Sequence, residues 1–218
     1  HGALEQTLVE QADGVRLFTG SFGGKPTHIL TGHEGHIKSV AFSPPYRAGD
    51  SYRLLLASCA SDTTIKLWDI TRPQEEIQAV ATLTDGDASV DHVIFSPDRD
   101  RPTLASCAAD GFLSLWDIDA PANRKRLRGH TAEGSSAAFA LSGNVLISGG
   151  RDNTLRLWDT RAETEGTLLG QQNDWIREVR ANPHGTMIAS ASKDGTVALW
   201  DAYGEEDTAY ATIRAHYT

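Results

Sequence analysis

The sequence predicts an all-β protein built from four-stranded antiparallel repeats, and three observations lead to this fold class. Four similar segments end in a Trp-Asp pair, and consecutive tryptophans stand 42 or 48 residues apart. Apolar and polar residues alternate before each pair, which is the period of a half-buried strand. An aspartate-centred turn precedes each segment, as expected for a hairpin. The four tryptophans are Trp68, Trp116, Trp158 and Trp200.

The strands of each repeat can be assigned in chain order. A strongly apolar segment such as 39–42 comes first and is typical of a strand buried on both faces. A second apolar strand rich in small residues follows, as at 56–58 and 188–190. The aspartate turn joins it to the Trp-bearing third strand, and the segment after the Trp-Asp pair supplies an outer strand. These turns are Ser61-Asp62-Thr63, Ala109-Asp110-Gly111, Arg151-Asp152-Asn153 and Lys193-Asp194-Gly195.

The repeat resembles the WD40 family, whose period is about 40–45 residues and whose signature is a Gly-His pair and a Trp-Asp ending. Gly-His pairs stand at Gly32-His33 and Gly129-His130. The resemblance implies a β-propeller of four-stranded antiparallel blades over residues 1–218. We expect complete blades at about 34–84, 85–129, 130–171 and 172–215. Residues 4–33 resemble three strands of a preceding blade, with Asp13 at the turn and Phe18 in place of tryptophan.

The resemblance also implies a closed ring, most often of seven blades. An open ring would leave sheet faces and edges exposed. We therefore expect the chain to be part of a longer protein whose remaining blades close the ring. Two alternatives stay open, namely closure by self-association and an unusual five-bladed ring.

Composition and charge narrow the classes of ligand. The formal net charge is −9, which argues against direct binding of nucleic acid or of an anionic membrane surface. The charge suits a basic protein partner, although it also serves solubility. Cys59 and Cys107 occupy equivalent strand positions, so we expect small buried residues and no disulfide or metal pair. With no long apolar run and no signal-peptide pattern, we expect a cytoplasmic protein.

The resemblance implies a hydrogen-bonded set of histidine, serine, aspartate and tryptophan within a blade. A buried indole N–H needs an acceptor and a buried carboxylate needs donors, so such a set would brace the blade. Two blades lack the histidine, and we expect them to be less rigid. The two complete sets are His33, Ser58, Asp62, Trp68 and His130, Ser148, Asp152, Trp158, and the two incomplete sets are Ser106, Asp110, Trp116 and Ser190, Asp194, Trp200.

These sets contain the residue types of a Ser-His-Asp catalytic triad, but they recur once per blade, whereas an active site does not. No nucleophile elbow accompanies them. His33 and His36 have a spacing that suits a metal, yet His33 is already used by its set and no cysteine ligand is near. We therefore predict no enzyme activity, no metal and no cofactor.

Function in a propeller is argued from its loops. Aligning the repeats places four groups on one rim, around the central channel. Trp175 stands out because it is the one tryptophan outside a Trp-Asp pair, and Trp and Arg dominate interface hot spots. The alternative is that Trp175 folds over its own blade. The groups are His36, Lys38, Ser61; Ser89, Asp91, Ala109; Glu133, Ser135, Arg151; and Trp175, Arg177, Lys193, of which Trp175, Arg177, Lys193, His36, Lys38 and Arg151 are the predicted partner-binding residues.

Two polar, turn-rich insertions, 44–52 and 97–102, are expected on the opposite rim as long loops. The function that fits these features best is a protein–protein interaction scaffold, as a module of a larger protein or complex. One alternative is the sensor domain of a multidomain signalling ATPase or kinase. Another is a small-ligand-binding or enzymatic propeller, for which Asp91, Glu133 and His36 are too mixed a set.

Overall fold

The computed structural model describes residues 14–17, 28–72, 77–84, 86–162, 165–203 and 209–214. Their main feature is four sheets of four antiparallel strands, each joined in the order inner strand, two middle strands, outer strand. Blade 1 contains β3 (Ile37–Phe42), β6 (Leu55–Ala60), β7 (Thr64–Asp69) and β8 (Ala79–Thr84); blade 2 contains β9 (Val90–Phe95), β10 (Thr103–Ala108), β11 (Leu113–Asp117) and β12 (Arg124–Leu127); blade 3 contains β13 (Gly134–Ala140), β14 (Val145–Gly150), β15 (Thr154–Asp159) and β16 (Thr167–Gln171); blade 4 contains β17 (Ile176–Ala181), β18 (Met187–Ser192), β19 (Thr196–Asp201) and β20 (Ala211–Arg214). The predicted all-β class with four-stranded antiparallel blades is confirmed.

A two-stranded sheet precedes blade 1. In it, β1 (Val15–Leu17) pairs with β2 (His28–Leu30). Val15 and Leu30 are buried and pack against Trp68 and its neighbours in blade 1. The third strand expected for residues 4–33 lies outside the described residues, and so do Asp13 and Phe18, which flank the described part of β1. The closure of the ring therefore stays a prediction.

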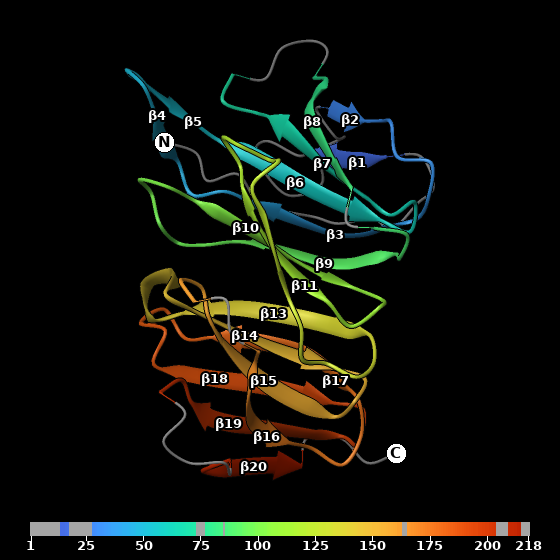
Figure 1. Ribbon diagram of the computed structural model, residues 1–218, viewed down its shortest axis with the longest axis vertical. Helices are drawn as coiled ribbons and strands as arrows, with labels where there is room; N and C mark the ends of the chain where they lie inside the picture. Colours follow the sequence, from blue (N-terminus) through green and yellow to red (C-terminus); the bar gives the residue numbers. More distant parts are fainter. Residues whose placement is uncertain are drawn as a thin grey trace.

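The four blades lie side by side in chain order along the long axis of the molecule, as Figure 1 shows. Inner strand β3 neighbours β9, β9 neighbours β13, and β13 neighbours β17. Each tryptophan of a Trp-Asp pair is buried against the preceding unit: Trp116 against blade 1, Trp158 against blade 2 and Trp200 against blade 3. Because every blade buries one face in this way, the hydrophobic core is a series of layers between blades.

Small residues allow the sheets to approach closely. A Cβ built on Gly149 in blade 3 would lie 2.3 Å from Ile176 Cγ2 in blade 4. Cys59 and Cys107 are fully buried free thiols in the same kind of layer, as the sequence predicted. The one helical turn among the described residues is η1 (Leu141–Gly143), and none of these residues form a helix able to cross a bilayer.

The insertion at 44–52 differs from the sequence-based expectation of a polar loop. It forms a hairpin of β4 (Tyr46–Ala48) and β5 (Ser51–Arg53), which turns at Gly49 with φ +63°. Tyr46 is only 1% exposed and belongs to the core layer between blades 1 and 2. One apolar anchor therefore turns the insertion into a packed element, and its Arg47 amide donates to the Arg99 carbonyl of the second insertion at 3.4 Å.

We predict that Tyr46→Ala lowers the free energy of unfolding by about 3 kcal/mol, because truncation leaves a cavity in the layer. Tyr52→Ala serves as the matched control in the same hairpin, since Tyr52 is 69% exposed and its loss should cost less than about 0.5 kcal/mol. Urea unfolding measures both values. Equal effects of the two substitutions would contradict a hairpin anchored by Tyr46.

Candidate partner-binding site

One rim of the molecule is built in the same way in all four blades. The loop that enters a blade is joined by a backbone hydrogen bond to the aspartate turn between its two middle strands. In each case the turn residue's N–H donates to the loop residue's carbonyl at 2.8–2.9 Å. The pairs are Ser61 with His36, Ala109 with Ser89, Arg151 with Glu133, and Lys193 with Trp175. The aligned loop and turn residues of the sequence therefore lie next to each other in space.

A β-bulge at the start of each inner strand completes this rim. The pairing register between the first two strands of each blade skips one residue, and the skipped residues are Lys38, Asp91, Ser135 and Arg177. A bulge leaves its extra residue out of the ladder and changes the direction of its side chain. The rim thus presents one unpaired residue per blade on a rigid strand.

Trp175 lies in the loop that enters blade 4, and three cationic side chains surround its ring. Lys193 Nζ is 4.2 Å from the ring centroid, and the guanidinium carbons of Arg151 and Arg177 are 4.6 and 5.8 Å from it. Trp175 is half-buried, whereas the three cations are exposed. Cation–π attraction holds such charges over the face of an indole. The result is an aromatic platform bordered by positive charge, contributed by blades 3 and 4.

Carboxylates balance two of these three cations. Glu133 Oε2 lies 2.9 Å from Arg151 Nη1, and Asp174 Oδ2 lies 3.7 Å from Lys193 Nζ. Arg177 forms no ion pair with any described residue. The guanidinium of Arg177 is therefore the group most available to an anionic partner.

The electrostatic environment of Glu133 links this platform to blades 1 and 2. Burial raises the pKa of Glu133, and a hydrogen bond and the charge of Asp91 raise it further. Arg151 and Lys38 oppose this shift. Side chains from three blades therefore share one charged environment beside Trp175.

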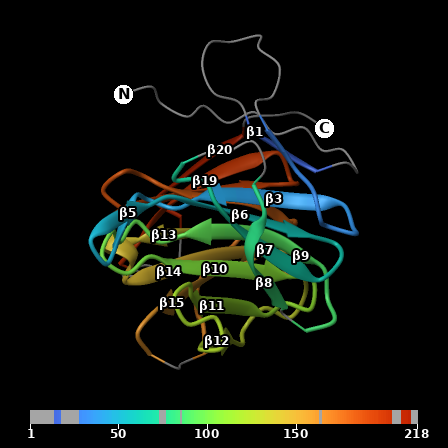
Figure 2. The same cartoon turned by 90° about the horizontal axis from the view of Figure 1, so that it is seen from above.

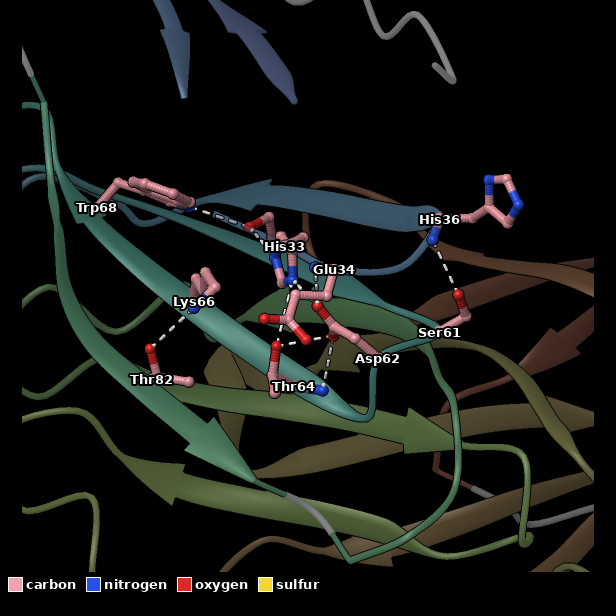
Figure 3. Close-up of polar contacts among 10 residues, drawn as sticks. His33, Glu34, His36, Ser61, Asp62, Thr64, Lys66, Trp68 and Thr82 are labelled. Carbon is pink, nitrogen blue, oxygen red and sulfur yellow. Dashed lines mark hydrogen bonds and ion pairs between the residues drawn. The ribbon is translucent and has the colours of Figure 1, made fainter. Parts of the chain in front are cut away.

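The structure places the sequence-predicted rim residues unequally. Trp175, Arg177, Lys193 and Arg151 form one cluster, and Lys38 joins it through Glu133. The exposed ring of His36 points away from the hydrogen-bonded groups (Figure 3). Its backbone is fixed on both sides, because its amide donates to Ser61 Oγ at 2.8 Å and its carbonyl accepts the Ser61 N–H at 2.9 Å. Sequence reasoning did not single out Asp174, although its position next to Trp175 was a usable signal.

A hydrogen-bonded chain supports the rim of blade 1, and Figure 3 shows it running from Trp68 through His33 to Asp62. The Trp68 indole N–H donates to Ser58 Oγ at 2.9 Å, and Ser58 Oγ lies 2.8 Å from His33 Nε2. His33 Nδ1 lies 2.9 Å from Asp62 Oδ2. The consistent assignment has each hydroxyl or ring N–H donating toward the carboxylate. The Asp62 carboxylate also accepts from the Thr64 hydroxyl at 2.7 Å.

Blade 3 repeats this chain. The Trp158 indole donates to Ser148 Oγ at 2.9 Å, Ser148 lies 2.7 Å from His130 Nε2, and His130 Nδ1 lies 3.0 Å from both oxygens of Asp152. The Asp152 carboxylate accepts the amide of Thr131 at 3.0 Å. The aspartate therefore fixes the entering loop as well as the turn, which explains why the rim has the same geometry in both blades.

Blade 4 fills its missing histidine position with glutamine. Ser190 Oγ accepts the Trp200 indole N–H at 2.8 Å and donates to Gln172 Oε1 at 2.6 Å, and Gln172 Nε2 donates to Thr196 Oγ1 at 3.0 Å. The Thr196 hydroxyl in turn donates to Asp194. The incomplete network expected from the sequence is therefore replaced by a continuous one.

Blade 2 is the exception. Its Trp116 indole donates to Ser106 at 3.0 Å, but Asp110 pairs with Arg126 of the outer strand, at 2.5 Å between Oδ2 and Nη2. The aspartate of this blade thus has an arginine partner where two other blades have histidine.

Hydrogen bonding determines the charge of the turn carboxylates. Burial would raise the pKa of Asp62, but hydrogen bonds from Thr64, His33 and the Glu34 amide outweigh burial and lower it to about 2. The pKa of Asp152 is also lowered, by His130 and Thr131 among others, against the effect of burial. Both ring nitrogens of His33 are engaged in hydrogen bonds, with Asp62 and with Ser58.

Comparison with known proteins gives two results. The family profile described as WD domain, G-beta repeat matches residues 24–69, 77–117, 122–159 and 163–201. Nuclear distribution protein PAC1 of Arthroderma benhamiae is 33% identical over 159 residues, which cover 69% of this chain and 33% of that protein. PAC1 of Fusarium vanettenii is 34% identical over 194 residues, which cover 72% of this chain and 34% of that protein. The matched part spans about a third of the length of these relatives.

The lowered pKa of Asp62 predicts that the folded state loses stability in acid. Because folding lowers the pKa of Asp62 from 3.8 to about 2, the folded state binds fewer protons than the unfolded chain between these values. The ionised Asp62 carboxylate therefore adds about 2 kcal/mol to the free energy of unfolding. This stabilisation is complete above about pH 5 and is lost as the pH falls through about 2. Urea unfolding of Asp62→Asn across this range should show a shallower decline than the parent chain.

Asp50→Asn, in the exposed turn of the β4–β5 hairpin, is the control for removal of a carboxyl group. A decline in the Asp62→Asn chain as steep as in the control would contradict the hydrogen-bonded role of Asp62.

Proposed function

Because this chain belongs to the WD40 repeat family, we propose that it is a non-catalytic scaffold that binds a protein or peptide partner on the rim around Trp175. The observation that carries the proposal is the half-buried indole bordered by three cations. Trp and Arg are the residue types that contribute most to binding at protein interfaces, provided that surrounding contacts exclude water. A partner that covers Trp175 would desolvate both kinds of group at once.

The rim is suited to binding because it is rigid before a partner arrives. Backbone hydrogen bonds fix each loop to its turn, and Lys38 and Arg177 project from bulges in paired strands. A preorganised surface loses less conformational entropy on association. The charges on the rim are of both signs, which favours selection of a partner over indiscriminate electrostatic attraction.

The proposal of a non-catalytic role rests on the state of the buried serines. Ser58 and Ser148 are fully buried, and each hydroxyl oxygen already accepts an indole N–H. A nucleophile needs a substrate within reach of its oxygen, and the indoles occupy that approach. The His-Ser-Asp-Trp sets are therefore assigned to the frame of the blades.

The wider role proposed here is that of a recognition module in a larger protein or complex. The relatives are called nuclear distribution protein PAC1, and this name describes those proteins and not the present chain. A sensor domain in a signalling ATPase or kinase remains the alternative stated from the sequence, and a cytoplasmic location remains a prediction.

We predict that Trp175→Ala raises the Kd for a stoichiometric partner, recovered in a pull-down with the purified chain, by about 30-fold. This loss corresponds to a hot spot of about 2 kcal/mol. Arg177→Ala should raise the Kd by a smaller factor, because one charged contact is removed. Circular dichroism and the thermal midpoint should remain those of the parent chain, since the side chain of Arg177 is exposed and that of Trp175 is half-buried.

Tyr203→Ala is the matched control, because Tyr203 is a 59% exposed aromatic residue that follows the far end of β19. Loss of the partner with Trp175→Ala and retention with Tyr203→Ala support the rim site. Retention with both variants, or turnover of a small molecule by the chain without any partner, would contradict the proposal.

A further inference from the structure

Glu133 lies on the rim between a cation with which it pairs and a carboxylate that repels it. Its Oε2 is 2.9 Å from Arg151 Nη1, and the Arg151 amide donates to the Glu133 carbonyl at 2.8 Å. The loop that enters blade 3 and the turn of the same blade therefore hold these two side chains next to each other. On its other side Glu133 faces Asp91, which stands at the bulge of β9 in blade 2. Glu133 is thus within reach of two neighbours of opposite charge.

One oxygen of Asp91 lacks a hydrogen-bond donor. The Ser89 hydroxyl donates to Asp91 Oδ1 at 3.0 Å, whereas Asp91 Oδ2 is buried and accepts no hydrogen bond from any described residue. An ionised Glu133 has no hydrogen to donate, so the two carboxylates repel each other here. A protonated Glu133 would donate to Asp91, which removes the repulsion and supplies the missing hydrogen bond.

The charges that act on Glu133 come from three blades. Burial raises the pKa of Glu133, and the hydrogen bond and charge of Asp91 raise it further, whereas Arg151 and Lys38 lower it. Inner strands β3, β9 and β13 adjoin one another in this order, and Figure 2 looks along this stack with blade 1 in front of blades 2 and 3. A group that draws Arg151 away from Glu133 therefore favours the protonated form of Glu133.

Arg151 connects Glu133 to the aromatic platform. Its guanidinium carbon is 4.6 Å from the centroid of the Trp175 ring, and its side chain is exposed. An anionic group that binds above Trp175 has to compete with the Glu133 carboxylate for this guanidinium. Loss of the negative charge of Glu133 ends the competition and adds positive charge to the surface that the partner meets.

We propose that Glu133 is a proton-dependent latch, which holds Arg151 when it is ionised and, when it is protonated, donates to Asp91 Oδ2 and releases Arg151 to an anionic group of the partner. The proton is exchanged with solvent, so no other reactant takes part. Because a proton on Glu133 favours release of Arg151, the affinity for an anionic partner rises as the pH falls. By linkage, binding of the partner increases the protonated fraction of Glu133. This latch rests on the proposed function, because it acts on a partner that covers Trp175.

Two other groups of the rim also respond to pH. The ring of His36 is exposed on the loop that enters blade 1, and histidine gains positive charge on mild acidification. Asp174 Oδ2 lies 3.7 Å from Lys193 Nζ, so it is the carboxylate beside another cation of the platform. The experiment therefore uses a His36→Gln background throughout and includes Asp174→Asn as the matched carboxylate control.

The binding test uses a rhodamine-labelled peptide of alternating cysteic acid and threonine, whose sulfonates keep their charge at every pH used, and fluorescence anisotropy with the full chain. Between about pH 8 and about pH 5 its affinity should rise about threefold, the size expected for one exposed ion pair. Glu133→Gln, whose amide can also donate to Asp91, should already bind with the higher affinity at about pH 8 and lose the rise. Asp174→Asn should retain the rise.

A second measurement does not depend on the peptide. Carbon-13 NMR of the chain labelled at the glutamate side chains follows the Glu133 carboxyl group, which is assigned by its absence in Glu133→Gln. Arg151→Gln should move the titration of Glu133 to higher pH, because its cation is lost. Asp91→Asn should move it to lower pH, because the repelling carboxylate is lost.

The results separate the latch from the proposed function. A titration of Glu133 that moves with neither substitution, or an affinity that rises as much in Glu133→Gln as in the parent chain, would overturn the latch. Equal affinity of the peptide for the parent chain and for Trp175→Ala, with the two expected shifts of the Glu133 titration, would instead contradict the rim site and support the exchange of Glu133 between Arg151 and Asp91.

Discussion

Every blade has to bury a large indole against the preceding unit and still provide an acceptor for its N–H. A serine on the neighbouring second strand, two residues after the position paired with the tryptophan, supplies that acceptor, and the distance is 2.8–3.0 Å in all four blades. A buried donor without a partner would cost about 1–3 kcal/mol. This one interaction fixes the relative position of the two middle strands of a blade, and the layers between blades are built on the indoles that it holds.

The next member of the chain varies, and the variation has consequences at the surface. His33 and His130 each connect the serine to an aspartate through hydrogen bonds, and this aspartate also accepts an amide of the entering loop. Gln172 performs the same task in blade 4 with an amide. In blade 2 the aspartate is held by an ion pair with Arg126 of the outer strand. Three blades therefore share a similar frame, whereas blade 2 holds its aspartate from the outer strand.

The sequence was sufficient to predict what repeats and insufficient to predict what occurs once. The tryptophan period and the aspartate turns predicted the four sheets. The alignment of the copies placed Trp175 and Lys193 in one group and Arg151 in another group on the same rim. The packing of Tyr46 was missed because a single apolar residue in a polar insertion has no period. The roles of Gln172 and Arg126 depend on which side chain reaches an empty position in space, and no local pattern records that.

The unfolding free energy of Ser148→Ala tests most directly whether the buried sets support the fold and take no part in chemistry. Urea unfolding should show a loss of about 1–3 kcal/mol, because both the Trp158 indole and His130 lose a buried partner. Ser142→Ala, at an exposed position near the start of β14, should change stability by less than about 0.5 kcal/mol. The account would be contradicted if the parent chain turned over a small molecule and Ser148→Ala lost that turnover without losing stability. The serine would then be a functional group and not part of the frame.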